Sequence, residues 1–315
     1  MEIIISHGAF FLCILLLGTI SGIFSERAGI VNIAINGFMV FGASVYAVYS
    51  TIFTEVIKTN NVWTNIPLVF LSSITTLLLS FLFGFAVIKL KADQTVVGFA
   101  INILAGGIGA LIVYLLASKV YAGQYVEFKN RFELALDTNE NKYGNILSLK
   151  VVLTVVITFL AWFALRKTKW GLRFRAIGEN PQAADVAGIN VNRMKWQGLM
   201  IVGLISGVAG SIFIQSSRLT EFSLTKDVSG FGFIALAIMI TSRWKVSISI
   251  IVSLFFSVLL SISFYGAISF GEGFRRYKDL FQILPYIVTL IVLVATSRNT
   301  YGPAAAGIPY DKSKR

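Results

Sequence analysis

Long apolar runs, separated by short polar segments, follow one another along the chain. They fall near residues 7–24, 28–50, 66–90, 96–118, 148–166, 196–215, 230–241, 246–265 and 281–297. A hydrocarbon core about 30 Å thick takes roughly 20 apolar residues per helical crossing. Because lipid offers no partners to backbone N–H and C=O groups, uninterrupted Leu, Ile, Val and Phe favour helices over barrel strands of alternating polarity. The pattern predicts an all-α integral membrane protein, a polytopic helical bundle of about nine transmembrane segments.

The seventh run, residues 230–241, is short for a full crossing. It has the length of a half-helix or re-entrant segment, which membranes tolerate only where protein or a water-filled cavity covers its ends. The composition agrees with a membrane protein, because 56% of the residues are hydrophobic, 13% are charged and the mean hydropathy is +0.78. No segment of soluble composition divides the runs, so we predict that residues 1–315 form a single transmembrane domain.

The formal net charge of +12 would suit a nucleic-acid partner, but its distribution points to membrane topology instead. Nine crossings place the termini on opposite sides, and the basic tail DKSKR favours a cytoplasmic C-terminus. On that side the segments between the runs hold 16 Lys and Arg against 5 Asp and Glu, which is the asymmetry of the positive-inside rule. We therefore expect a multi-pass protein of the cell membrane with its N-terminus outside, in contact with lipids and with no nucleic acid.

The predicted topology assigns the two longest polar connections to opposite sides. Residues 119–147 form an extracytoplasmic loop with balanced charges. An external partner would meet this loop, although a plain solvated loop fits the same composition. Residues 170–195 form a cytoplasmic loop with four Lys and Arg against two Asp and Glu.

Amide side chains interrupt two of the apolar runs. Asn32 and Asn36 stand four residues apart, a spacing that puts them on one face of a helix, and Asn102 lies within the fourth run. Polar side chains are costly in a bilayer unless they face a bundle interior, a cavity or a partner helix. Either a translocation pathway or hydrogen bonding across a helix interface would provide such a face.

Glycine pairs at four-residue spacing recur within the runs, at Gly18–Gly22 and at Gly203–Gly207. This small-xxx-small pattern lets helix backbones approach one another. We therefore predict that these glycines serve close helix packing.

Several kinds of chemistry lack supporting residues in this sequence. No Asp or Glu lies in the middle of an apolar run, which disfavours a relay of buried carboxylates. The sequence has no Gly-Lys pair and hence no phosphate-binding loop of the GxxxxGK[ST] type. With one cysteine, Cys13, and one histidine, His7, neither an internal disulfide nor a Cys/His metal site is expected. We predict no catalytic residue, no metal and no cofactor bound by this chain.

A short polar island, residues 175–196, separates the fifth and sixth runs. Asn180 can cap a helix start, Pro181 fits the first helical turn, and Gly188 can end the helix. The helix between them, PQAADVA, has small side chains and is too short to be stable alone in water. It fits a groove on another protein, or it is a helical turn in a cytoplasmic loop whose flanking cations only fix orientation.

Four stretches of the sequence resemble one family. GENPQAADVAGINV is similar to the cytoplasmic coupling segment of ABC-importer permeases of the branched-chain amino acid, ribose and nucleoside type. SERAGIVNIAINGFMVFGA and GFIALAIMITSRWK resemble an early and a late motif of that group, and PAAAGIPYDK resembles the C-terminal tail of its nucleoside branch. One position departs from the pattern, because Asn36 stands where many relatives carry Glu.

The resemblance implies partners and a mechanism. Residues 179–188 would dock into a cleft on a cytoplasmic ABC ATPase, which would bind the ATP and Mg. A second, similar permease chain would complete the pair, expected to be a heterodimer, and an extracytoplasmic substrate-binding protein or lipoprotein would deliver solute. Closure of the ATPase would move the docked helix and drive alternating access. The docking contact would be formed by Glu179, Asn180, Ala183, Ala184, Asp185 and Gly188.

We therefore expect a permease subunit of an ATP-driven importer, which forms half of a translocation pathway for nucleosides or related ribosides. Aromatic stacking and amide hydrogen bonds would suit such solutes. A ribose-type sugar permease is the nearest alternative, and an ion-coupled carrier or channel without an ATPase, or a membrane scaffold, are alternatives of other classes. The candidate pathway residues are Asn32, Asn36, Asn102, Phe231 and Phe233.

Overall fold

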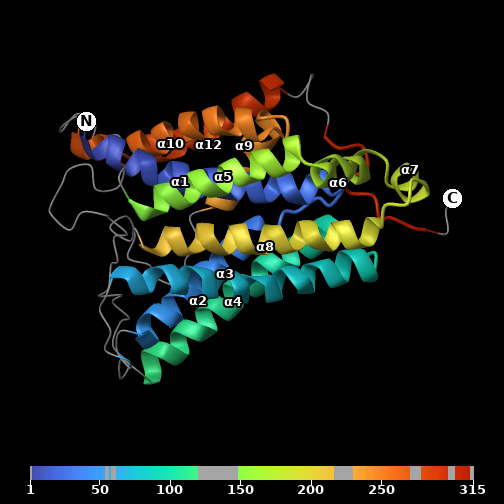
Figure 1. The fold of residues 1–315 in the computed structure, drawn as a ribbon. Helices are drawn as coiled ribbons and strands as arrows, with labels where there is room; N and C mark the ends of the chain where they lie inside the picture. Colours follow the sequence, from blue (N-terminus) through green and yellow to red (C-terminus); the bar gives the residue numbers. More distant parts are fainter. Residues whose placement is uncertain are drawn as a thin grey trace.

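The computed structural model of the chain describes residues 2–53, 57, 62–119, 148–215, 230–269, 278–296 and 302–312. Within these ranges the chain folds into a bundle of elongated helices, with the N-terminus at one end and both α7 and the C-terminus at the other (Figure 1). The helices are α1 (Glu2–Arg27), α2 (Ile35–Thr51), η2 (Val62–Thr64), α3 (Asn65–Gly84), the π-helical η3 (Phe85–Lys89), α4 (Gln94–Lys119), α5 (Leu149–Lys167), α6 (Lys169–Glu179), α7 (Pro181–Val186), α8 (Val191–Gln215), α9 (Phe231–Thr241), α10 (Val246–Ser269) and α12 (Lys278–Thr296).

Within the described residues, six helices are long and apolar enough to cross a membrane. Each predicted apolar run contains a helix, but α2 has 17 residues and α9 only 11, and the apolar part of α12 is similarly short. The all-α membrane class is therefore confirmed, whereas the count of nine crossings is not. The six spans are Ile4–Arg27, Asn65–Lys89, Gln94–Ile112, Leu149–Lys167, Val191–Ile214 and Val246–Gly266.

Helices α1, α2 and α8 form the interior of the bundle. Most of their residues are buried, with α1 packed against α5, α8, α9 and α10, and α8 packed against α1, α2 and α3. The outer helices turn large apolar side chains outward, among them Ile74 on α3, Ile103 on α4, Phe159 on α5 and Ile251 on α10. Such a wide apolar exterior would be unfavourable in water and matches a lipid surrounding.

Both predicted glycine pairs lie at close helix contacts. The Gly18–Gly22 pair faces α9, where a Cβ on the first glycine would lie 2.9 Å from the Cβ of Ala235. The Gly203–Gly207 pair faces α3, where a Cβ on the second glycine would lie 2.6 Å from the Cα of Ser73. Real Cβ atoms do not approach this closely, so the predicted packing role of these glycines is confirmed.

The run predicted as one helix over residues 28–50 is broken near its start. Helix α1 ends at Arg27, the chain is non-helical up to Ala34, and α2 begins at Ile35. The Asn32 side chain accepts a hydrogen bond from Ala34 N at 3.0 Å, a local bond that competes with helix formation. The prediction that Asn32 and Asn36 share one helix face is therefore wrong, because only Asn36 belongs to α2.

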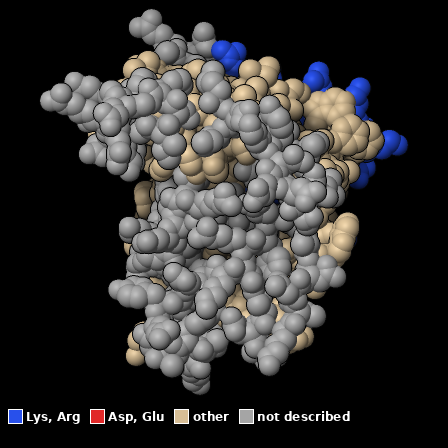
Figure 2. All heavy atoms as spheres, turned by 90° about the vertical axis from the view of Figure 1, so that its left-hand side faces the viewer, with Lys and Arg blue, Asp and Glu red and all other residues tan. Residues whose placement is uncertain are grey.

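The polar connections gather at one end of the bundle. This polar end comprises the end of α1, the α3–α4 connection, α6, α7, the start of α8, the α9–α10 turn and residues 302–312 (Figure 1). Figure 2 is a view from the opposite end; among the described residues, Lys and Arg are visible only at the upper and right-hand edge of the molecule, and no Asp or Glu is visible. The predicted loop at residues 119–147 lies outside the described residues, except for Lys119 at the end of α4.

Candidate functional site

Helices α6 and α7, with the turn that follows them, form a small helical knob at the polar end, residues 169–188. The two helices meet at Asn180, whose side chain accepts a hydrogen bond from Ala183 N at 3.0 Å and caps α7. Pro181 occupies the first turn of α7, and Gly188 follows the helix with a φ of +81°. The helix start and stop that the sequence predicts are therefore confirmed.

The predicted docking residues differ in exposure. Glu179, Asn180, Ala183 and Gly188 are exposed and Asp185 is half-buried, whereas only 5% of Ala184 is exposed. The Ala184 side chain is therefore packed inside its own chain. It holds α7 in place and is not exposed to a docking partner. The outer side of the knob is apolar at its tip, since 76% of Val186 is exposed.

The base of the knob packs tightly against the end of α1. Gly178 has no room for a side chain, because a Cβ there would overlap the carbonyl oxygen of Arg27. Gly29, just beyond α1, has a φ of +75°, which favours glycine. It also lies beside the knob base, because a Cβ placed on it would be 3.7 Å from the Cα of Gly178. If the knob base moves toward α1, it therefore pushes directly on the α1 backbone.

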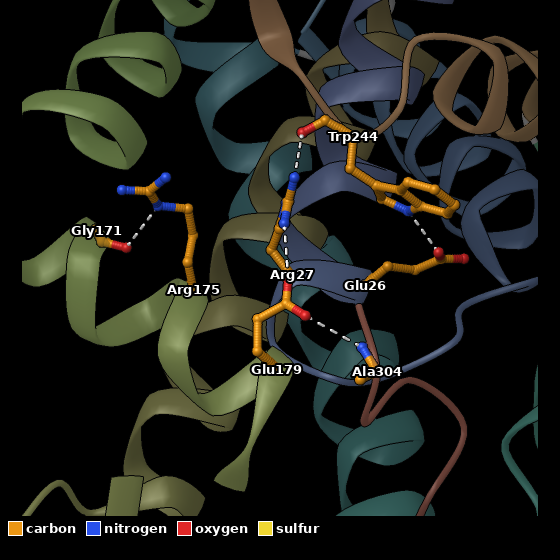
Figure 3. Close-up of polar contacts among 7 residues, drawn as sticks. All are labelled: Glu26, Arg27, Gly171, Arg175, Glu179, Trp244 and Ala304. Atoms are coloured by element: carbon orange, nitrogen blue, oxygen red, sulfur yellow. Dashed lines mark hydrogen bonds and ion pairs between the residues drawn. The ribbon is translucent and has the colours of Figure 1, made fainter. Parts of the chain in front are cut away.

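Polar side chains join the knob base to three other parts of the polar end (Figure 3). Arg27 Nη1 lies 3.2 Å from Glu179 Oε1, and Arg27 Nη2 donates to the carbonyl oxygen of Trp244 at 3.4 Å. The Trp244 indole N–H donates to Glu26 Oε2 at 2.6 Å, and Ala304 N donates to Glu179 Oε2 at 3.4 Å. The end of α1, the α9–α10 turn and the C-terminal tail thus all contact the knob or its immediate partner Arg27.

The α9–α10 turn has an unusual backbone that this network supports. Arg243 and Trp244 both have a φ of +53°, the left-handed region that costs a residue other than glycine about 1 kcal/mol or more. Such a conformation persists where the surroundings fix it. Here the buried Trp244 is held on both sides, by Glu26 through its ring and by Arg27 through its carbonyl oxygen.

The ion pair in the network contributes less than the packing around it. The Glu179 side chain is 55% exposed and the Arg27 side chain 19%, and ion pairs at such a surface are worth about 0–1 kcal/mol. Gly178 is buried and packs directly against the α1 backbone. We therefore regard the packed backbones as the mechanical link and the ion pair as a device that sets orientation.

A second polar cluster surrounds the helix break at residues 28–34. Gln94 on α4 accepts a hydrogen bond from Val31 N at 2.7 Å. Further along α4, Asn102 accepts from Gly37 N at 2.7 Å and donates to Ile33 O at 3.0 Å. Backbone groups that a helix would have paired are therefore paired by side chains of α4, so the break is a built feature of the bundle.

Helix α9 meets the same break. Asn36 accepts a hydrogen bond from Gly232 N at 3.1 Å, so α2 and α9 both begin inside the bundle and close to one another. The neighbouring Phe231 is buried and makes edge contacts with Phe11 and Phe213, at centroid distances of 5.5 and 5.8 Å. Phe233 is set apart from this core, with 42% of its surface exposed.

Three of the five predicted pathway residues, Asn32, Asn36 and Asn102, therefore lie at the break or at the start of α2 beside it. The hydrogen bonds of Asn36 and Asn102 match the alternative in which amides join neighbouring helices. Asn32 is fully buried, and its Nδ2 group has no hydrogen-bond partner in the described part of the chain. A role of these residues in a solute pathway stays a prediction.

Sequence reasoning missed two components of the site. The Glu26–Trp244 pair joins residues 218 positions apart, and its one sequence signal is a polar cluster directly after each apolar run, SER and TSRWK. The attachment of the tail to the knob uses the backbone N–H groups of Ala304 and Ala305 and so leaves no side-chain signal in the tail. Among the residues that the structure describes, no group of three or more His, Cys, Asp or Glu is placed to hold a metal ion.

Known proteins are similar to this chain in sequence over nearly its whole length. The nucleoside ABC transporter permease protein NupC of Lactococcus lactis is 32% identical over 100% of this chain and 98% of its own length. The guanosine ABC transporter permease protein NupQ of Bacillus subtilis is 33% identical over 96% of this chain and 94% of its own length. The ribose import permease protein RbsC of Bacillus subtilis is 27% identical over 50% of this chain and 48% of its own length.

No solved structure matches the chain. The family described as branched-chain amino acid transport system, permease component, matches residues 4–293, which includes both the helix break and the knob. With this match and its full-length relatives, the chain belongs to the branched-chain amino acid transport permease family of ABC transporters.

Proposed function

We propose that the chain is the permease subunit of an ATP-driven importer and forms half of a translocation pathway for nucleosides or related ribosides. The two relatives named for nucleoside and guanosine transport support this solute class, because each matches nearly the full chain. A ribose-type solute has weaker support, since the ribose relative matches only half of it. An ion-coupled carrier or channel finds no support among these relatives.

The coupling contact is proposed to lie at residues 179–188, on the polar end. One observation carries this proposal: a two-helix knob projects an apolar tip outward while its base packs against the backbone of α1. An ATPase that binds ATP and Mg and grips the exposed residues Glu179, Asn180, Ala183 and Gly188 could push or pull the knob. Because Gly178 touches the end of α1, that movement would reach the centre of the bundle.

The remaining partners and the orientation follow the same proposal. The polar end would face the cytoplasm, where the ATPase is. A second permease chain, in a heterodimer, would supply the other half of the pathway, and an extracytoplasmic binding protein or lipoprotein would deliver the solute. The pathway would run past the helix break, where α2 and α9 begin inside the bundle and the buried Nδ2 group of Asn32 has no hydrogen-bond partner among the described residues.

Uptake of radiolabelled guanosine by cells that carry the complete transporter tests both parts of the proposal. We expect unlabelled nucleosides to compete strongly and ribose to compete weakly. Ala183→Trp adds bulk to the exposed side of α7 and should abolish uptake while membrane insertion is unchanged. Asn192→Trp, which adds the same bulk to an exposed position on the first turn of α8, is the matched control. Normal uptake by Ala183→Trp would remove the docking assignment.

A further inference from the structure

The C-terminal tail lies across the polar end as an irregular strap, residues 302–312, with turns at residues 304–307. It is attached to the knob at two points. Ala305 N donates a hydrogen bond to Gly178 O at 2.9 Å, and Ala304 N donates to Glu179 Oε2 at 3.4 Å. Both contacts fall on the base of the knob, at the end of α6, and leave α7 itself uncovered.

The strap is also attached to parts of the polar end that the knob does not touch. Gly302 lies against the Trp244 ring, so that a Cβ on this glycine would lie 3.2 Å from the ring. Asp311 Oδ2 lies 3.0 Å from Lys91 Nζ, in the connection between η3 and α4. Tyr310 packs against the apolar core. The strap therefore joins the knob base to the α9–α10 turn at one end and to the α3–α4 connection at the other.

These attachments matter because the knob is small. Helix α7 has six residues and packs mainly against α6 and α8, and a helix of that length has little stability of its own. A force on its tip would bend the knob unless its base is fixed. The strap fixes the base with a main-chain hydrogen bond from Ala305 N to Gly178 O, and the buried residues Pro303 and Ala305 keep water away from this bond.

We propose that residues 302–312 position the knob and make its base one rigid body with the α9–α10 turn and the α3–α4 connection. A partner that displaces the knob then moves α9, α10 and α4 together with α1. Ala304, Ala305 and Asp311 are the positioning residues. The mechanical consequence depends on the proposed coupling function, whereas the position of the knob can be measured without it.

Truncations of the full-length protein test the strap. Cys13 is the one native cysteine and is buried, so a spin label on Ala187→Cys reports α7 specifically. A chain that ends at Lys312 keeps every contact described above and is the control. A chain that ends at Tyr310 loses the Lys91 ion pair, and one that ends at Tyr301 loses the whole strap. In lipid nanodiscs, label mobility should rise slightly in the chain that ends at Tyr310 and strongly in the chain that ends at Tyr301.

Uptake by the complete transporter should fall several-fold for the chain that ends at Tyr301, at unchanged membrane level. If this chain fails to insert, Ala305→Pro removes only the N–H group that donates to Gly178, and Lys312→Pro at an exposed position is its control. If label mobility is unchanged both in Ala305→Pro and in the chain that ends at Tyr301, the proposal that the strap positions the knob is overturned. Raised mobility with normal uptake supports the strap and overturns the coupling role of the knob instead.

Discussion

At the residue scale, the link between the knob and the bundle depends on the absence of a side chain at Gly178. Its neighbour across the contact is the carbonyl group of Arg27, a backbone atom at the end of a buried helix that cannot rotate away. The same glycine presents the carbonyl oxygen that Ala305 N binds. One position thus serves the contact with α1 and the contact with the tail.

Gly178→Ala should therefore separate the knob from α1. Overpacking of this kind costs about 1–3 kcal/mol, and we expect a lower melting temperature in detergent together with reduced uptake. Gly106→Ala on α4 is the control, because a Cβ there meets nothing within 4 Å. That change should leave uptake normal and add up to about 1 kcal/mol of stability, as alanine favours a helix over glycine. Equal behaviour of the two variants would contradict the packing argument.

At the element scale, the start of α2 is fixed by α4. Asn102 binds the backbone on both sides of the α2 start, at Ile33 O and Gly37 N. Asn102→Leu keeps the size of the side chain and leaves both backbone groups unpaired, so we expect a loss of about 1–2 kcal/mol in unfolding free energy. Asn192→Leu, at an exposed position, should cost much less. Thermal unfolding in detergent measures the difference, and equal melting temperatures would show that α2 starts independently of Asn102.

Local signals explain which elements could be predicted from the sequence. The knob could be predicted because Asn180, Pro181 and Gly188 act within a few residues, through caps and turn geometry. The break before α2 could not, because apolar residues such as Ile30 and Ile33 continue the run. The side chains that bind the backbone of the break lie more than 60 positions away, on α4, and only the folded bundle brings them together.

At the scale of the whole molecule, charge separates the two ends. The described cations of the polar end include Arg27 at the end of α1, Lys91 between η3 and α4, and Arg173 on α6. At the opposite end Lys150, at the start of α5, is buried with its Nζ 5.7 Å from the centroid of the Phe10 ring. Cations concentrate on the cytoplasmic side of membrane proteins, so this asymmetry supports an orientation with the polar end inside.

Single cysteines at the two ends test this orientation. Cys13 is buried, so a membrane-impermeant maleimide should react only with introduced residues. We expect Ile57→Cys, which is half-exposed between α2 and α3, to be labelled on intact cells. Ala187→Cys in the knob should react only after the membrane is permeabilised. The reverse pattern would place the knob outside, where no ATPase could reach it, and the coupling proposal would then have no physical basis. Labelling of both sites on intact cells would have the same consequence, because it too exposes the knob to the exterior.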